Sequence, residues 1–387
     1  MRPAIADRSA TAAPAFKAAH GTGDSWGTVA KACLDGLGEP PPGANLGLLY
    51  ATDVLADDLG SILTFLRETT RIPAWTGSVG VGITGGGQEF YDRPAAALMV
   101  AALPEDSFRL FGPVGGSETP GGAGEAVASN AWVHDRQPVF AIAHGDPRNP
   151  RIERIVAQVA GEAGTFLVGG LTSSRRTFPQ IAGAITDGGL SGVIFAPQVP
   201  VATGLSQGCT PFGPAHTITE GVAGTIRALD GRPALEVLKE DLGGILTRDP
   251  SQIGGEIRVA FLVASSDTGD YLVRDLTALD ADSGSLSVNE PAARGQRLIF
   301  CRRDEAAARS DLQRMVAAAK QRAGGSPKAG VYFSCVARGR HLFAAGSPEL
   351  ALVRGELGDI PLVGFFGNGE ICNDRLYGYT GVLALFH

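Results

Sequence analysis

The chain has 387 residues, of which 44% are hydrophobic and 19% charged, and its formal net charge is −7. This composition indicates a folded protein with an extensive core and excludes a disordered chain. The acidic excess argues against nucleic-acid binding, which depends on Lys and Arg neutralising phosphates. No apolar run reaches about 18 residues, so we expect no transmembrane helix. The five scattered cysteines are typical of a reducing cytoplasm.

The first recognisable unit of the chain follows a short lead, residues 1–14, which we expect to be disordered. The apolar run 45–52 predicts a strand, and 57–70 predicts a helix because its leucines and isoleucine recur at helical spacing. A glycine-rich turn and the apolar strand 95–103 complete this unit.

The same order of elements returns near the C-terminus. Residues 329–335 predict a strand and 347–357 a helix, with Ser347 as N-cap and Pro348 in the first turn. A glycine turn within 360–371 and the strand 379–386 follow. The two glycine turns align as Gly77-x-x-Gly80-x-Gly82 with Gly364-x-x-Gly367-x-Gly369, each after an Ile-Pro pair.

A weaker third copy lies between these two. It contains a strand at 139–146, a helix at 150–164, a glycine-containing segment at 165–174 and a strand at 190–197. The strands of the copies are apolar on both faces, which is typical of sheets buried on both sides. The sequence therefore predicts a mixed α/β fold with two related lobes of strand–helix–strand units, whose mixed sheets are covered by helices.

Two short motifs suggest chemistry that their surroundings do not support. Gly80-x-Gly82-x-x-Gly85 has the spacing of a dinucleotide-binding loop, but Pro94 and further glycines follow where that loop needs a helix. Gly204-x-Ser206-x-Gly208 has the pattern of a nucleophile elbow, but Cys209 and Pro211 follow instead of a helix. We interpret the first motif as a turn at the interface of the two lobes and the second as a strand-to-strand turn.

Several segments resemble the FIST family of sensory modules. "YFSCVARGRHLF" is similar to the family's Cys-x-Gly-Arg-Gly segment, and "IPLVGFFGNGEI" to its Pro-x-x-Gly-Phe-Phe-x-x-Gly-Glu-Ile segment. The resemblance extends over about residues 15–387 and implies a FIST N-terminal domain at 15–232 and a C-terminal domain at 233–387. Ala337 departs from the family pattern, which has glycine there.

The resemblance implies a non-catalytic cytoplasmic sensor of a small ligand, such as an amino acid or another small carboxylate. The signal would pass to a separate partner, such as a histidine kinase or a cyclic-nucleotide enzyme, and the sensor itself could form a homodimer. No membrane partner is expected. Some family members instead bind haem and report nitric oxide, which is the alternative reading of this chain.

The candidate ligand site lies in the C-terminal repeat. Arg338 and Arg340 follow a strand end, where guanidinium groups suit a carboxylate or phosphate, or else form a salt bridge to Glu370 or another acid. Glu370 follows a glycine turn and could receive an amino group. The full candidate set is Cys335, Arg338, Arg340, Phe365, Gly367, Asn368 and Glu370.

Two further hypotheses involve other residues. Haem needs only one axial imidazole, and the candidate histidines are His216, His341 and His144. A hydrolase would use Cys335 or Ser206 as its nucleophile, although a buried cysteine and a strand turn are the simpler interpretations. No histidine spacing predicts a metal site.

Overall fold

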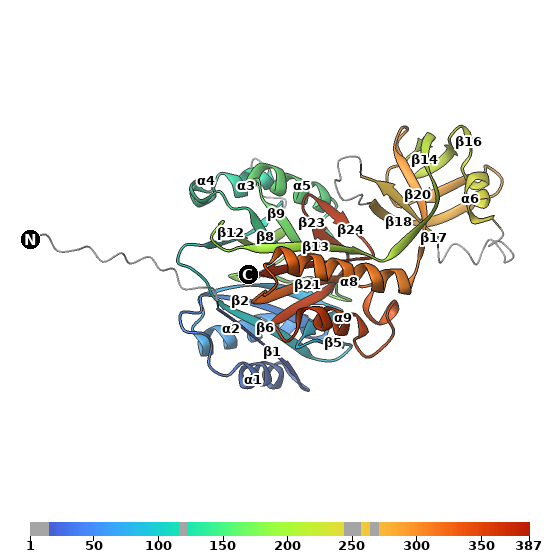
Figure 1. Ribbon diagram of the computed structural model, residues 1–387. Helices are drawn as coiled ribbons and strands as arrows, with labels where there is room; N and C mark the ends of the chain where they lie inside the picture. The colour runs from blue at the N-terminus through green and yellow to red at the C-terminus, as the bar shows by residue number, and fades with distance from the viewer. Residues whose placement is uncertain (1–14, 116–121, 244–256, 264–270) are drawn as a thin grey trace, which may run out of the picture. The chain divides into compact units, whose positions relative to one another are not determined.

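The computed structural model describes residues 15–115, 122–243, 257–263 and 271–387 (Figure 1). The chain divides into two compact units, which are described separately. The first comprises the chain up to Leu205 together with Gln313–Leu376 and Gly381–His387, and the second comprises Ser206–Leu312 and Tyr377–Thr380. In both, each helix of the described ranges is too short or too polar to traverse a lipid bilayer.

The first unit contains three six-stranded mixed sheets of the same design. Each is built around two parallel strands, joined by a crossover that contains a helix. The order in the first sheet is β1 (Ala15–Thr22), β6 (Ala95–Ala102), β2 (Leu46–Thr52), β3 (Ala74–Gly80), β10 (Gln180–Ala182) and β11 (Ala184–Thr186). Its crossover contains η1 (Asp53–Asp58) and α2 (Leu59–Thr70).

The other two sheets repeat this order. The second is β7 (Phe108–Val114), β12 (Leu190–Phe195), β8 (Phe140–Gly145), β9 (Phe166–Leu171), β23 (Glu370–Cys372) and β24 (Arg375–Tyr377), with crossover helix α5 (Ile152–Ala163). The third is β13 (Val201–Gln207), β25 (Thr380–Phe386), β21 (Ala329–Cys335), β22 (Leu362–Gly367), β4 (Gly82–Gly85) and β5 (Gln88–Tyr91), with crossover helix α9 (Pro348–Leu357).

The three repeats exchange their hairpins in a cycle. The hairpin β4–β5 follows β3 in the chain but pairs with β22 of the third sheet. In the same way β10–β11 follows β9 but pairs with β3, and β23 follows β22 but pairs with β9. Every sheet is therefore completed by another repeat, which ties the three repeats into one unit.

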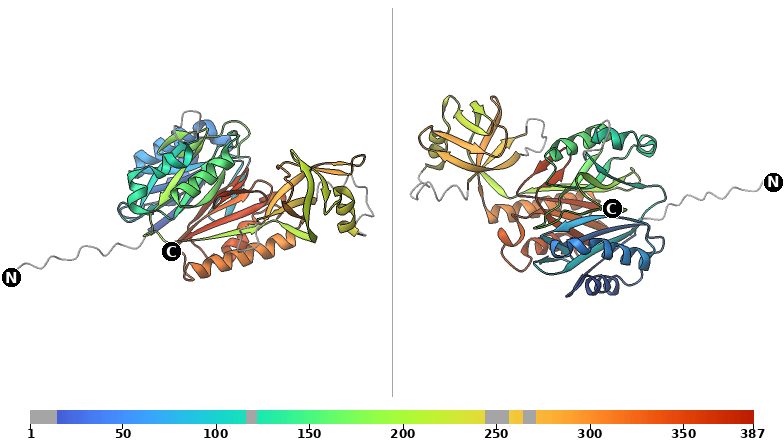
Figure 2. Two further views of the ribbon diagram at one scale, coloured as in Figure 1. Left: turned by 90° about the horizontal axis from the view of Figure 1, so that it is seen from above. Right: turned by 180° about the vertical axis from the view of Figure 1, so that it is seen from behind.

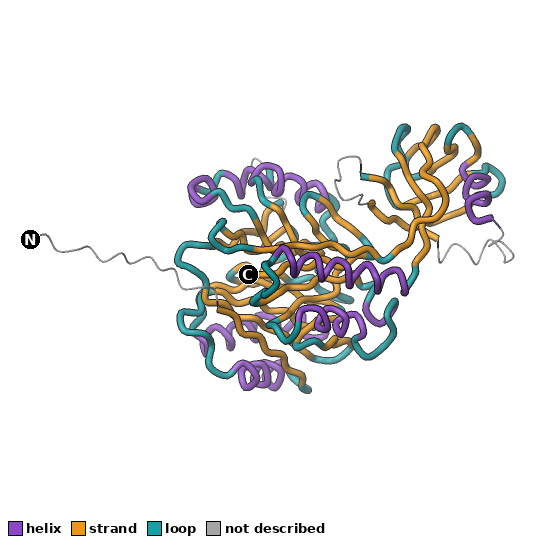
Figure 3. Tube along the Cα trace, in the orientation of Figure 1, coloured by secondary structure: helices purple, strands orange, loops and turns teal. Residues whose placement is uncertain are grey.

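The central core of this unit is shared by all three sheets. It includes Leu48 of the first sheet, Ile142 of the second and Val331 of the third, all at most 1% exposed. The outer faces are covered by helices (Figures 2 and 3). In the first repeat these are α1 (Trp26–Leu37) and α2, and in the second α3 (Ala123–Ala128), α4 (Ala131–Arg136) and α5. The long helix α8 (Glu305–Arg322) precedes β21.

The second unit is a small barrel. Its strands follow the order β14 (Cys209–Val222), β20 (Arg297–Arg303), β17 (Ile257–Leu262), β18 (Tyr271–Asp280), β19 (Ser285–Val288), β15 (Thr225–Leu229) and β16 (Arg232–Pro233). A further pairing between β14 and β15 closes the sheet, which removes the open edges. The helix α6 (Ala234–Leu242) contributes Leu235 and Leu238 to the barrel's core.

The mixed α/β class predicted from the sequence is confirmed. The third copy, which is weak in sequence, is a complete repeat, so the repeated unit occurs three times in the first unit. Ser347 precedes α9 as expected, but it does not cap the helix with its side chain. Instead its Oγ accepts a hydrogen bond from the backbone N–H of Glu89, 2.8 Å away.

Candidate functional site

Equivalent residues of the three repeats can be matched from one steric feature. In each parallel pair, a glycine passes so close to the neighbouring strand that a Cβ would lie within 1.8 Å of a carbonyl oxygen. These glycines are Gly77, Gly169 and Gly364, which face the carbonyls of Leu49, Ala143 and Tyr332. The sequence alignment of Gly77 with Gly364 is thus confirmed, and Gly169 is their counterpart.

The glycine turns of the three repeats meet one another. The backbone N–H of Val81 donates to Ser173 Oγ at 2.9 Å, and Ser173 Oγ donates in turn to the carbonyl of Phe366. Val81 belongs to the first repeat, Ser173 to the second and Phe366 to the third. The backbone N–H of Asn368 also donates to the carbonyl of Leu171, at 3.0 Å. We call the region where these turns meet the turn junction.

The turn junction explains the glycines of the dinucleotide-like motif. β3 leads through Val81 directly into β4, so no helix opens on these glycines. A Cβ on Gly80 would lie 2.6 Å from the carbonyl oxygen of Gly82, and one on Gly82 would lie 2.2 Å from the ring of Tyr91. The stretch predicted as a glycine turn is instead mostly strand, because Gly80 lies in β3 and Gly82 and Gly85 lie in β4. Its glycines permit close approach of the backbones.

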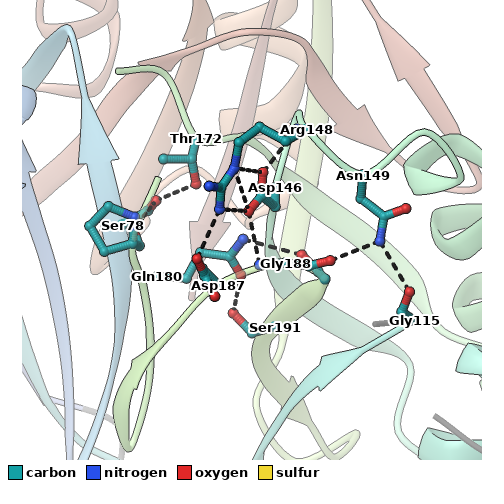
Figure 4. A network of polar contacts seen from close by, with 12 residues as sticks. Ser78, Gly115, Asp146, Arg148, Asn149, Thr172, Gln180, Asp187, Gly188 and Ser191 are labelled. Carbon is teal, nitrogen blue, oxygen red and sulfur yellow. Dashed lines mark hydrogen bonds and ion pairs between the residues drawn. The ribbon is translucent and has the colours of Figure 1, made fainter. Parts of the chain in front are cut away.

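A network of polar contacts follows the parallel strands of the second repeat (Figure 4). Asp146, directly after β8, is fully buried and forms a salt bridge with Arg148, which also pairs with Asp187 at 2.9 Å. Nearby, Ser78 Oγ lies 2.7 Å from Thr172 Oγ1, between the first repeat and the second. The charged and hydrogen-bonding groups of these residues pair with one another. We therefore infer that they hold the loops around the turn junction in place.

A second set of charges links all three repeats at the turn junction. Asp53, directly after β2, accepts two hydrogen bonds from the guanidinium group of Arg175, at 2.8 and 2.6 Å. Arg175 also donates to Asp92 at 2.9 Å, and Asp92 forms a salt bridge with Arg340. The guanidinium group of Arg340 lies 4.6 Å from the centre of the Tyr91 ring. Arg340 beside Asp92 holds the pKa of that carboxyl below its usual range.

Arg338 occupies a different environment from Arg340. Its side chain is fully buried and its Nε donates to Glu349 at 2.7 Å. Glu349, in the first turn of α9, also accepts hydrogen bonds from Tyr332 Oη at 2.7 Å, from Ser334 Oγ and from the backbone N–H of Gly339. The main partner of Arg338 is therefore Glu349, and Glu370 contributes a weaker electrostatic interaction.

The remaining candidates of the third repeat lie in or beside strands β21, β22 and β23. Cys335 is buried and pairs with Gly367 across the parallel strands, while Asn368 Nδ2 lies 3.5 Å from the carbonyl of Thr172. Glu370 is fully buried and pairs with Gly170 of the second repeat. Phe365 stacks with Tyr50 at a centroid distance of 5.4 Å. Ala337 does not have a positive φ, so its departure from the family pattern causes no backbone strain.

The three candidate histidines are in unrelated environments. His144 is fully buried among Tyr50, Phe333 and Phe365, and its Nε2 lies 3.1 Å from Tyr50 Oη. Burial lowers the pKa of His144 to about 3, so it is neutral. His341 is exposed in the short helix η3 (Gly339–His341).

His216 lies in the barrel between two carboxylates. Its Nδ1 is 2.7 Å from Asp230 and its Nε2 is 2.8 Å from Asp241 of α6. Iron coordination would have to displace one of these carboxylates. Although burial opposes it, hydrogen bonding to Asp230 and Asp241 raises the pKa of His216 above its usual value.

Replacing His216 with Ala is expected to lower the free energy of unfolding of the barrel by about 1–3 kcal/mol near pH 6, because two charge-assisted hydrogen bonds are lost. Since the folded state has the higher pKa, the stabilisation is complete below the unfolded pKa and declines as pH rises through the folded pKa. Denaturant titrations at about pH 6 and about pH 9 should show the smaller difference at the higher pH. His134→Ala, on the exposed face of α4, is the control; equal losses for both variants would contradict this role.

Ser206 does not lie on the strand-to-helix turn that a nucleophile elbow requires. Ser206 is fully buried in β13, and strand β14 follows it without an intervening helix. The elbow pattern is therefore a strand-to-strand connection, as its context in the sequence indicates. In the part of the chain that the structure describes, no three His, Cys, Asp or Glu side chains are placed to hold a metal ion.

Comparison with known proteins identifies the family. The FIST N domain matches residues 45–232 and the FIST C domain matches residues 234–373. The chain therefore belongs to the FIST family, whose domains are sensory and bind small ligands. This confirms the resemblance noted in the sequence.

The curated relatives match most of the length of the chain. An uncharacterized protein of Mycobacterium tuberculosis is 29% identical over 362 residues, which are 90% of this chain and 92% of the relative. One of Mycobacterium bovis is 29% identical over 353 residues, or 88% of this chain and 89% of the relative. Among solved structures, T. maritima PurL complexed with AMPPCP is 11% identical, with a TM-score of 0.25 over 96% of this chain and 72% of that chain. A likeness at that score supports no inference.

Sequence reasoning missed three charged residues of the turn junction. Asp53, Asp92 and Arg175 are separated by up to 122 residues, and no short motif contains them together. Two of them do carry a local signal, because Asp53 directly follows an apolar strand and Arg175 closely follows a glycine-containing strand. Polar groups at the carboxyl ends of parallel strands are candidates for ligand binding.

Proposed function

We propose that this protein senses an amino acid or another small carboxylate, which binds at the turn junction with Arg340 and Arg175 as its carboxylate anchors. The observation that carries the proposal is the position of Asp92. Its carboxylate is shared by the two guanidinium groups, which come from two different repeats. A pair of arginines that already holds one carboxylate has the chemistry to hold another.

Exposure and topology also support this position. The side chains of Arg340 and Arg175 are 40% and 54% exposed, so a ligand can reach them, whereas Arg338 is fully buried. Both follow the carboxyl ends of parallel strands, where ligands of α/β proteins commonly bind. In this proposal Arg338 is a positioning residue, which holds the 336–347 loop through Glu349, and Cys335, Phe365, Gly367, Asn368 and Glu370 form the supporting wall.

The signal would leave the protein through conformational change at the junction. Ligand carboxylate would compete with Asp92 for Arg340 and Arg175, and so would change the contacts among three repeats. A separate signalling enzyme, such as a histidine kinase or a cyclic-nucleotide enzyme, would read that change. This output follows from the family resemblance.

A thermal-shift panel of amino acids and small carboxylates tests the proposal. At least one compound should raise the melting temperature, because a ligand that binds only the folded state stabilises it. The shift should be lost in Arg340→Ala and in Arg175→Ala, and kept in Arg227→Ala, an exposed arginine of the barrel that pairs with Glu220. A ligand that stabilises all three variants equally would contradict the assigned anchors.

A further inference from the structure

The hairpin β4–β5 of the first repeat, which pairs with the third sheet, contains a carboxyl group that is not one of the proposed ligand anchors. Glu89, on β5, accepts a hydrogen bond from Tyr91 Oη at its Oε2, 2.9 Å away. Its other oxygen, Oε1, is buried and has no hydrogen-bond partner among the described residues. A buried carboxylate oxygen without a donor is costly, whereas a protonated carboxyl is tolerated there.

The surroundings of Glu89 make negative charge still less favourable. Glu349 of α9 is fully buried close by, and its carboxylate is already paired with Arg338. Burial and the neighbouring Glu349 together raise the pKa of Glu89 to about 7, against smaller opposing effects of Tyr91 and the backbone N–H of Leu350. Two arginines close to the hairpin are paired with other groups: Arg340 with Asp92, and Arg354 with Asp359 and the carbonyl of Gly86.

Other charged and titratable groups around the hairpin are neutral or engaged elsewhere; the guanidinium group of Arg93, for example, lies over the Phe90 ring. From β1, His20 packs against the turn at Gly85 and Gly86, and burial lowers its pKa, so it is neutral at pH 7. Asp92, at the end of the hairpin, adds negative charge that Arg175 and Arg340 balance. Protonation of the Glu89 carboxyl group is therefore the simplest way to avoid an unbalanced negative charge there.

We propose that Glu89 is a proton-controlled latch between hairpin β4–β5 and the loop 336–347 with α9. When Glu89 is protonated, the hairpin packs against the loop, where the backbone N–H of Glu89 donates to Ser347 Oγ and the guanidinium group of Arg340 lies over the Tyr91 ring. When it is ionised, it faces Glu349 across the same contact and loosens it. The loop carries Arg340, whose guanidinium group lies over the Tyr91 ring, so loosening would move one of the proposed ligand anchors.

The latch is tested without any ligand, by denaturant titrations of the wild type and Glu89→Gln between about pH 5 and about pH 8. Glutamine retains the shape of a protonated carboxyl. Because the folded state has the higher pKa, the wild type should lose stability relative to the variant as pH rises from about 5 to about 8. The unfolding equilibrium constant of the wild type should rise on the order of 10- to 100-fold relative to Glu89→Gln.

Two further measurements make the test specific. Glu68→Gln, on the exposed face of α2, should follow the wild type at every pH. Hydrogen exchange in 336–347, corrected for the intrinsic effect of pH, should accelerate at high pH in the wild type and not in Glu89→Gln. A wild-type-to-variant difference that stays constant with pH would overturn the latch. Failure to find a carboxylate ligand would overturn the proposed function and leave this result untouched.

Discussion

Replacing Glu349 with Gln is expected to lower the free energy of unfolding of the first unit by about 3–5 kcal/mol, because the change leaves Arg338 buried without its counter-charge. The side chains of Glu349 and Arg338 are both fully buried. The carboxylate of Glu349 also accepts hydrogen bonds from Tyr332, Ser334 and the backbone N–H of Gly339. Equilibrium denaturation with guanidinium chloride, followed by tryptophan fluorescence, measures the loss.

A matched variant and a double variant distinguish the contribution of the ion pair to stability from that of helix α9. Glu356→Gln lies on the same helix, outside the Arg338 pair, and should change stability by less than about 0.5 kcal/mol. Combining Glu349→Gln with Arg338→Met should recover the part of the loss that comes from the unpaired charge, because no buried guanidinium group remains and the glutamine oxygen can still accept hydrogen bonds from Tyr332 and Ser334. A Glu349→Gln variant as stable as the wild type would show that Arg338 does not depend on this carboxylate.

Replacing Gly77, Gly169 or Gly364 with Ala is expected to destabilise the first unit by about 4 kcal/mol or more in each case. The added Cβ would lie 1.7–1.8 Å from a carbonyl oxygen of the neighbouring parallel strand, so the two strands would have to separate. Chemical denaturation of the three single variants gives the comparison directly. Similar losses at all three positions are expected from the threefold repeat.

The control for these variants is a glycine that has room for a methyl group. Gly161 lies within α5, and a Cβ there would contact nothing within 4 Å. Gly161→Ala should therefore stabilise the protein by about 0.5–1 kcal/mol. A marked difference between Gly169→Ala and the other two would contradict the equivalence of the second repeat.

The elements and their repetition could be predicted from sequence because they depend on local patterns. The strand at 329–335 and the helix over 347–357 occur within one residue of the predicted bounds. The alignment of Gly82-Ile83 with Gly369-Glu370 is also confirmed, since Ile83 and Glu370 occupy the same register position on their partner sheets. Only glycine fits where two backbones approach closely. The glycines therefore recur at a fixed spacing, which can be recognised in a single sequence.

The partners of the charged side chains could not be predicted in the same way. They depend on the exchanged hairpins, which place Asp92 of the first repeat beside Arg340 of the third, 248 positions away in the chain. The assignment of Arg338 and Arg340 to one shared site reflects their closeness in sequence. In the fold, one is buried on Glu349 and the other is half-exposed on Asp92.

In the proposed function, ligand binds at the turn junction, where the three repeats meet. Hydrogen exchange of the full chain, with and without an equimolar mixture of the twenty amino acids, tests it most directly. Added protection is expected in three segments together, near residues 79–93, 172–176 and 335–341. Protection confined to the barrel, or to a single one of these segments, would contradict it.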